Sequence, residues 1–228
     1  MSKNASGYMG PQVGKLGPAV GYLWKGRNVY RAYNPFPRNP KTPEQVLHRA
    51  KFSMLNQLAR AFSTAINFGF DYKAKSEGTL TRGLFVHANK NVVTGSNPES
   101  LNISYQDIVV SDGSLTPVYF NNVDFETQHQ VNVTFTPNSG VGNAQNDDKV
   151  FIVVYNSDVK ECLVSQTAKR SEGQVSVNIP AHWEGMHAQV YGFAVTCAEE
   201  VTFIESYNGN VYPGQASESS FIGAGTLS

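Results

Sequence analysis

The chain has 228 residues, of which 40% are hydrophobic and 11% aromatic, enough for one sizeable folded domain and an appendage. This composition argues against global disorder. No apolar run is long enough to cross a bilayer, and the N-terminus lacks the apolar stretch of a secretory signal, so we expect a soluble protein made in a cytoplasm.

The formal net charge of zero conceals two oppositely charged segments. Residues 1–60 carry ten Lys and Arg against one acid, whereas residues 61–228 carry eight Lys and Arg against seventeen acids. The segments therefore have formal charges near +9 and −9. This asymmetry predicts an electrostatic partner for the first segment: nucleic acid, an acidic neighbouring subunit or the acidic part of another copy.

Residues 1–41 are predicted to form an extended basic arm. Glycines recur every three to five residues from Gly7 to Gly26, too often for a helix interior. The segment GYLWKGRNVYRAY indicates a small hairpin that turns at 25–28, and the prolines of Asn34–Pro40 favour extended backbone. The arm has too little apolar mass to fold alone, so we expect it to lie along its own domain or a neighbour.

A capped helix is predicted next, from about 43 to about 67, within a segment spanning 42–70. Thr42 is a favourable N-cap, Pro43 suits the first helical position, and Gln45 completes a capping box with Thr42. Apolar residues then recur at helical spacing, and no Gly or Pro interrupts them before Gly69.

Residues 71–228 are predicted to form an antiparallel β-sandwich of immunoglobulin-like type, so that the fold is mainly β. Period-two alternation or short apolar runs between turn clusters indicate the strands, and no helical segments separate them. The strands expected to be half-buried are Leu84–Val86, Leu101–Tyr105, Val131–Phe135 and Val175–Ile179. Val150–Tyr155 and Val190–Val195 are expected to be central strands covered on both faces, and the tail from Tyr207 to Ser228 to add a final strand.

Several motifs resemble a family of uncharacterised proteins from Bacteroidota and their phages. They are GxxGxxVGYxWKGxNVxR in the arm, NPKTPEQVLHRAKF at 39–52, and DDKVFIVVYN at 147–156. The resemblance covers nearly the whole chain and implies a glycine-rich basic arm, a helix and a β domain. It implies no established activity. Related arm-plus-helix patterns occur in small phage structural proteins, which implies a virion role.

No catalytic motif is present, which predicts a protein that is not an enzyme and holds no cofactor or metal. His182 and His187 flank Glu184, but a separation of five is not helical ligand spacing, so a turn at a sheet edge with Trp183 packed beside it is favoured. Cys162 and Cys197 are predicted to be reduced, mostly buried thiols, with a cross-strand disulfide as the alternative.

The arm carries the candidate interface, in which basic and aromatic side chains are interleaved. Its residues are Tyr22, Trp24, Lys25, Arg27, Tyr30, Arg31, Phe36 and Arg38. Such residues can bind single-stranded nucleic acid, with aromatic rings stacked on bases and basic groups against phosphates. They can also anchor an arm on an acidic protein surface. A protein partner is favoured because the apolar content is high and the rest of the chain is acidic.

The predicted function is that of a structural component of a phage virion, such as a ring, connector, neck or tail protein. Its expected partners are other copies of itself and neighbouring virion proteins, with no membrane contact. The expected location is the virion, after synthesis in the host bacterial cytoplasm. Two alternatives remain: a nucleic-acid-binding accessory protein that uses the arm, and a carbohydrate-binding or adhesive sandwich with Trp183 or tyrosines as a sugar platform.

Overall fold

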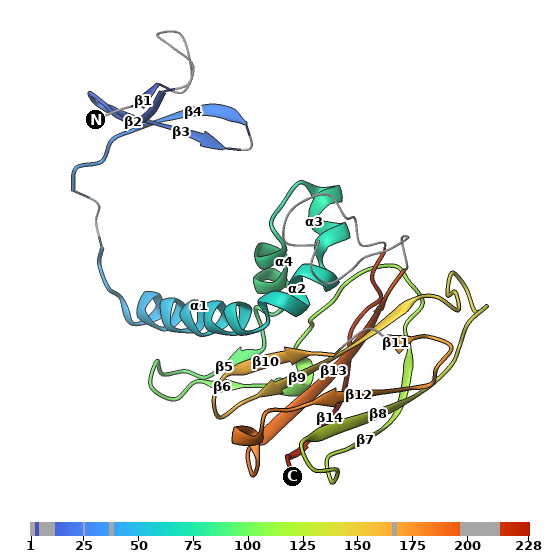
Figure 1. Ribbon diagram of the computed structural model, residues 1–228. Coiled ribbons are helices and arrows are strands. Elements are labelled where there is room, and N and C mark those ends of the chain that lie inside the picture. Colours follow the sequence, from blue (N-terminus) through green and yellow to red (C-terminus); the bar gives the residue numbers. More distant parts are fainter. Residues whose placement is uncertain (1–2, 5–11, 25, 37–38, 166–167, 197–214) are drawn as a thin grey trace. The chain divides into compact units, whose positions relative to one another are not determined.

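The computed structural model describes residues 3–4, 12–24, 26–36, 39–165, 168–196 and 215–228 (Figure 1). The chain divides into two units, Met1–Thr42 and Pro43–Ser228. We call them the N-terminal sheet and the body, and each is described by itself.

The N-terminal sheet has four antiparallel strands in the order β1-β2-β3-β4. They are β1 (Lys3–Asn4), β2 (Gln12–Leu16), β3 (Ala19–Trp24) and β4 (Arg27–Ala32). Trp24 pairs with Arg27, and Gly26 between them has a φ of 74°, the left-handed backbone that a tight hairpin needs. The predicted hairpin is confirmed. The arm is not simply extended, because its four strands hydrogen-bond to one another in a sheet.

Four helices open the body. They are α1 (Pro43–Ala61), α2 (Ser63–Gly69), α3 (Asp71–Glu77) and α4 (Thr81–Ala88). The predicted start at Pro43 is confirmed, but the single predicted helix is two. Backbone hydrogen bonds from Phe62 N–H to Leu58 O and from Ile66 N–H to Phe62 O, both 2.9 Å, carry the chain across the break. The break precedes Ser63 and Thr64, whose side chains compete for backbone hydrogen bonds and favour helix ends.

The expected strand Leu84–Val86 was wrong, since these residues lie in α4, and residues 71–77 and 81–88 are helical rather than part of a sandwich. Phe85 is fully buried, with its ring centroid 6.0 Å from that of Phe62 and 6.4 Å from that of Phe70. A three-residue apolar run fits a strand and a buried helical turn equally well, and here tertiary packing selects the helix.

The rest of the body is mainly β, and its named strands pair antiparallel. They are β5 (Val93–Thr94), β6 (Asn102–Ile103), β7 (Tyr119–Asp124), β8 (Gln130–Thr136), β9 (Lys149–Asn156), β10 (Glu161–Val164), β11 (Ala168–Lys169), β12 (Gln174–Asn178), β13 (His187–Val195) and β14 (Ser220–Thr226). Two short 3₁₀ helices, η1 (Tyr105–Asp107) and η2 (Ala181–Trp183), lie in the loops. The larger sheet has the order β10-β9-β13-β14, with β11 also pairing β9, and the smaller has the order β12-β8-β7.

The larger sheet lies between the helices and the smaller sheet (Figure 1). Along β9, Phe151, Val153 and Tyr155 pack into the cluster that contains Phe62 of the helical layer. The alternate residues, for example Ile152, pack into the cluster shared with β8 and β12. Two covered faces explain why β9 and β13 are continuously apolar. The prediction of two central strands is confirmed, as is the final strand, β14, which pairs with β13.

The body contains a buried ion pair. Arg170 is fully buried, and its Nε lies 3.1 Å from an oxygen of Asp148, which is 2% exposed. The guanidinium also donates to the side-chain oxygen of Asn138 (2.6 Å) and to the carbonyl of Thr116 (2.8 Å). These contacts join three loops at one end of the two sheets. Among the described residues, no helix is long and apolar enough to span a membrane.

Candidate protein-binding surface

Strand alternation gathers the charges of the N-terminal sheet on one face. Residues paired across strands share a face, and every second residue of a strand returns to it. The pairs Lys15–Val20, Val20–Arg31, Tyr22–Val29 and Trp24–Arg27 therefore lie on the same side. Tyr33 also lies there, because the Lys15 ammonium sits 4.0 Å from the centre of its ring. We call this surface the cationic face; its charged and aromatic members are Lys15, Tyr22, Trp24, Arg27, Arg31 and Tyr33.

Among the described residues, the opposite face carries no charged side chain. It carries Leu16, Leu23 and Tyr30, each more than a third exposed, and the Asn28 amide donates to the Tyr30 hydroxyl (2.8 Å). Gly21 is also on this face, where a Cβ would collide with the carbonyl oxygen of Gln12. Only Gly can occupy this position without spreading β2 and β3 apart.

The aromatic rings of the cationic face are exposed. Tyr22, Trp24 and Tyr33 have exposed fractions of 38%, 57% and 41%. Among the described residues of the N-terminal sheet, Gly21 alone is buried, so the sheet has no core of its own. A single-layer sheet that keeps both faces in water is marginally stable, and exposed aromatic clusters of this kind mark interaction sites.

The structure separates the predicted interface residues. It brings Tyr22, Trp24, Arg27 and Arg31 together on the cationic face and places Tyr30 on the other. Phe36 follows the sheet and is 85% exposed, while Lys25 and Arg38 lie outside the described residues. Lys15 and Tyr33 belong to the same surface but were not in the predicted set. Continuing the alternation of the hairpin into β2 would have found Lys15.

A sequence model described as "Family of unknown function (DUF6266)" matches residues 11–207. The chain belongs to the DUF6266 family. The matched range includes β2, β3 and β4 of the N-terminal sheet and runs through the body to beyond β13. Both units are therefore part of what defines the family.

Comparison of this DUF6266 protein with curated proteins finds no match. Among solved structures, the fn3 domain of the human collagen alpha-1(XX) chain is 13% identical, with a TM-score of 0.27. That match covers 51% of this chain and 84% of the fn3 domain. At this TM-score the likeness carries no argument about fold or function.

Three histidines of the DUF6266 body pair with separate carboxylates. His182 lies 4.0 Å from Glu161, His187 lies 3.4 Å from Asp158, and His129 lies 3.9 Å from Glu184. The Asp158 carboxylate accepts the backbone N–H of His187, which lowers its pKa. Within the described part of the chain, no three His, Cys, Asp or Glu side chains come together as metal ligands.

Trp183 cannot serve as a sugar platform. Its side chain is fully buried in the cluster between the two sheets, so a carbohydrate has no access to the ring. This removes the residue on which the carbohydrate-binding alternative chiefly depended. The predicted packing of Trp183 at a turn beside the sheet is confirmed, since it ends η2.

Cys162 of β10 is half-buried and not in a disulfide, and burial raises the pKa of its thiol to about 12. In a Cys197→Ala variant at pH 8, we expect iodoacetamide to alkylate native Cys162 far more slowly than the same chain in denaturant. The thiolate is the reactive form, and such a shift lowers its population roughly a thousandfold. Equal native and denatured rates, followed by mass spectrometry, would contradict this burial. Cys197 lies outside the described residues.

Proposed function

We propose that this protein is a non-enzymatic structural component of a larger assembly, in which the cationic face of one copy binds the acidic body of another. The main support for the proposal is that Lys15, Arg27 and Arg31 lie with exposed aromatic rings on one face of the N-terminal sheet, which has no core of its own. Arginine and large aromatic residues are the side chains that dominate protein interfaces.

Charge complementarity supports a second copy as the partner. Residues 1–42 carry seven Lys and Arg and no acid, whereas residues 43–228 carry eleven Lys and Arg against eighteen acids. The two units thus have formal charges of +7 and −7. Complementary potentials of this kind accelerate encounter and select the partner.

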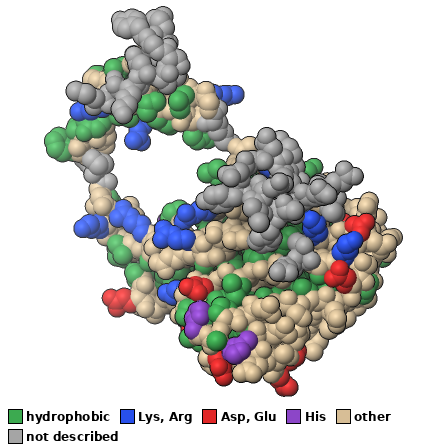
Figure 2. Space-filling model, viewed as in Figure 1, with side chains coloured by type: hydrophobic (Ala, Val, Ile, Leu, Met, Phe, Trp, Pro, Cys, Tyr) green, Lys and Arg blue, Asp and Glu red, His purple; other side chains and the backbone are tan. Residues whose placement is uncertain are grey.

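One acidic surface on the body suits this role. The exposed carboxylates of Asp158, Glu161 and Glu184 lie around η2 and the β9–β10 turn, with side chains between 46% and 62% exposed. The ion-pair partners that the structure gives these three carboxylates are His187, His182 and His129. Figure 2 shows acidic and histidine side chains beside one another on the body.

The proposal also includes a location in the virion and an immunoglobulin-like sandwich in the body. The virion is suggested by the resemblance to small phage structural proteins, whose basic arm and helix have the same order. A head-to-tail contact repeated around an axis closes into a ring, which suits a ring, connector, neck or tail protein. The virion location predicts recovery of the protein from purified phage particles of the source culture by mass spectrometry, and its absence from such particles would contradict it.

The assembly is tested with two variants, one that lacks residues 1–42 and one that carries Lys15→Glu, Arg27→Glu and Arg31→Glu. Sedimentation velocity of the full chain is expected to show salt-sensitive self-association. Both variants are expected to remain folded by circular dichroism and to sediment as monomers, because they lose the cationic face but keep the body's core.

A matched control replaces Lys73, Lys90 and Lys169 of the body with Glu, an equal change in net charge. This control is expected to associate like the unmodified chain. Equal association of the truncated and full chains would overturn the proposal, as would a full chain that is monomeric at low salt. If the full chain instead binds single-stranded DNA and the triple Glu variant does not, the nucleic-acid alternative replaces the proposal.

A further inference from the structure

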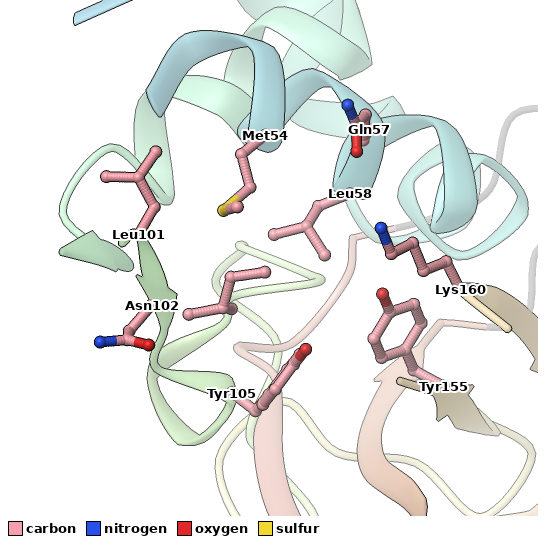
Figure 3. A pocket seen from close by; sticks show the side chains of 9 residues that line it. Met54, Gln57, Leu58, Leu101, Asn102, Tyr105, Tyr155 and Lys160 are labelled. Atoms are coloured by element: carbon pink, nitrogen blue, oxygen red, sulfur yellow. The ribbon is translucent and has the colours of Figure 1, made fainter. Parts of the chain in front are cut away.

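A pocket of about 360 Å³ lies in the body between α1, β6, η1 and the turn that joins β9 to β10 (Figure 3). This volume is in the range of small-molecule sites. It has room for about a dozen non-hydrogen atoms, taking a water molecule's share of liquid volume, about 30 Å³, as the unit. The pocket lies wholly in the body, and through Lys160 it shares the β9–β10 turn with the acidic surface that carries Asp158 and Glu161.

One end of the pocket is polar and opens to solvent at Gln57 and Lys160. Figure 3 shows the Gln57 amide, the Tyr155 hydroxyl and the Lys160 ammonium gathered on the same side. Within the described part of the chain, none of these groups has a hydrogen-bond or ion-pair partner. Tyr155 is only 2% exposed as a residue, and its hydroxyl lines the pocket, where a ligand oxygen can take the place of water.

The other end is apolar. Met54 and Leu101 lie across the pocket from Lys160, with Leu58 between the two ends (Figure 3). The Tyr155 ring is held from behind by Phe62, at 4.8 Å between ring centroids, so the position of its hydroxyl is fixed by the core. Burial raises the pKa of Tyr155, which keeps the hydroxyl protonated and able to donate.

We propose that this pocket binds a small amphipathic carboxylate, with the carboxylate against Lys160, Tyr155 and Gln57 and an unbranched apolar chain toward Met54 and Leu101. The single Lys160 charge matches a single negative charge, and the Tyr155 hydroxyl and the Gln57 amide supply hydrogen-bond donors to the two carboxylate oxygens. A chain of about ten carbons fits the volume by the estimate above.

Isothermal titration calorimetry of the full-length protein with decanoate tests the proposal. Saturable binding of one decanoate per chain is expected, with an increase in melting temperature. Lys160→Met is expected to weaken binding roughly tenfold or more, since it removes a charge-assisted contact. Tyr155→Phe is expected to weaken it severalfold while keeping the ring that packs on Phe62. The matched control Lys90→Met, an exposed lysine outside the pocket, is expected to bind like the unmodified chain.

Two further probes separate the ends of the pocket. Decanol, which lacks the charge, and butyrate, which lacks the chain, are both expected to bind much more weakly than decanoate. Met54→Trp is expected to abolish decanoate binding by filling the apolar end, with an unchanged circular dichroism spectrum. The proposal is overturned if decanoate does not bind below its aggregation concentration. Equal affinity of Lys160→Met and Lys90→Met, or equal affinity for decanol and decanoate, would also overturn it.

Discussion

Replacing Arg170 with Met is expected to lower the free energy of unfolding by about 3–5 kcal/mol, the usual loss when one partner of a buried ion pair is removed. The substitution leaves Asp148, 2% exposed, without its cation, and it leaves the Asn138 and Thr116 oxygens without their donor. Urea unfolding followed by circular dichroism measures the change.

The neighbouring lysine is the matched control. Lys169 pairs with Asp147 on the surface, where the two side chains are 60% and 71% exposed. Lys169→Met is expected to change stability by less than about 0.5 kcal/mol, since exposed pairs contribute little. Adding Asp148→Asn to Arg170→Met is expected to recover part of the loss, because the uncompensated charge is gone. An unfolding curve for Arg170→Met that matches the unmodified protein would show that the pair does not stabilise the body.

Replacing Leu58 with Asp is expected to cost about 3–5 kcal/mol, since it removes a core side chain and buries an unpaired carboxylate. Leu58 is 3% exposed and belongs to the cluster that joins the helices to the larger sheet. Ser53→Asp, at an exposed position of the same helix, is the control, with an expected change of less than about 0.5 kcal/mol. Similar melting temperatures for Leu58→Asp and Ser53→Asp would contradict the packing of α1 on the sheet.

The sequence was sufficient for the strands whose periodicity is unambiguous. Alternation in Val131–Phe135 and Val175–Ile179 matches β8 and β12, and the continuous apolar run Val150–Tyr155 matches the doubly covered β9. The helix start was readable because a proline follows a good capping residue. Helix α4 could not be predicted in this way. The apolar run Leu84–Val86 is compatible with a strand or a helix, and the packing of the aromatic cluster around Phe85 selects the helix.

The candidate surface was predicted in composition but not in geometry. Listing aromatic and basic residues along the arm put Tyr30 with Tyr22, whereas the hairpin register places them on opposite faces. The pocket had no local signal. Met54, Leu101 and the Tyr155–Lys160 segment are far apart in the chain and carry no spacing pattern, so only the tertiary fold brings them together.

The order of the two units along the chain has a consequence for synthesis. The N-terminal sheet is complete at Ala32, but the larger sheet of the body requires β14, which ends at Thr226. At a synthesis rate of about 5–20 residues per second, the ribosome takes about 10–40 s to proceed from Ala32 to Thr226. During this time the aromatic rings of the N-terminal sheet are exposed while the body is incomplete. In this interval, the positive charges of Lys15, Arg27 and Arg31 have a second expected effect. Like charges repel, so the cationic faces of two nascent chains on one polysome are expected to resist stacking on each other while their bodies are incomplete.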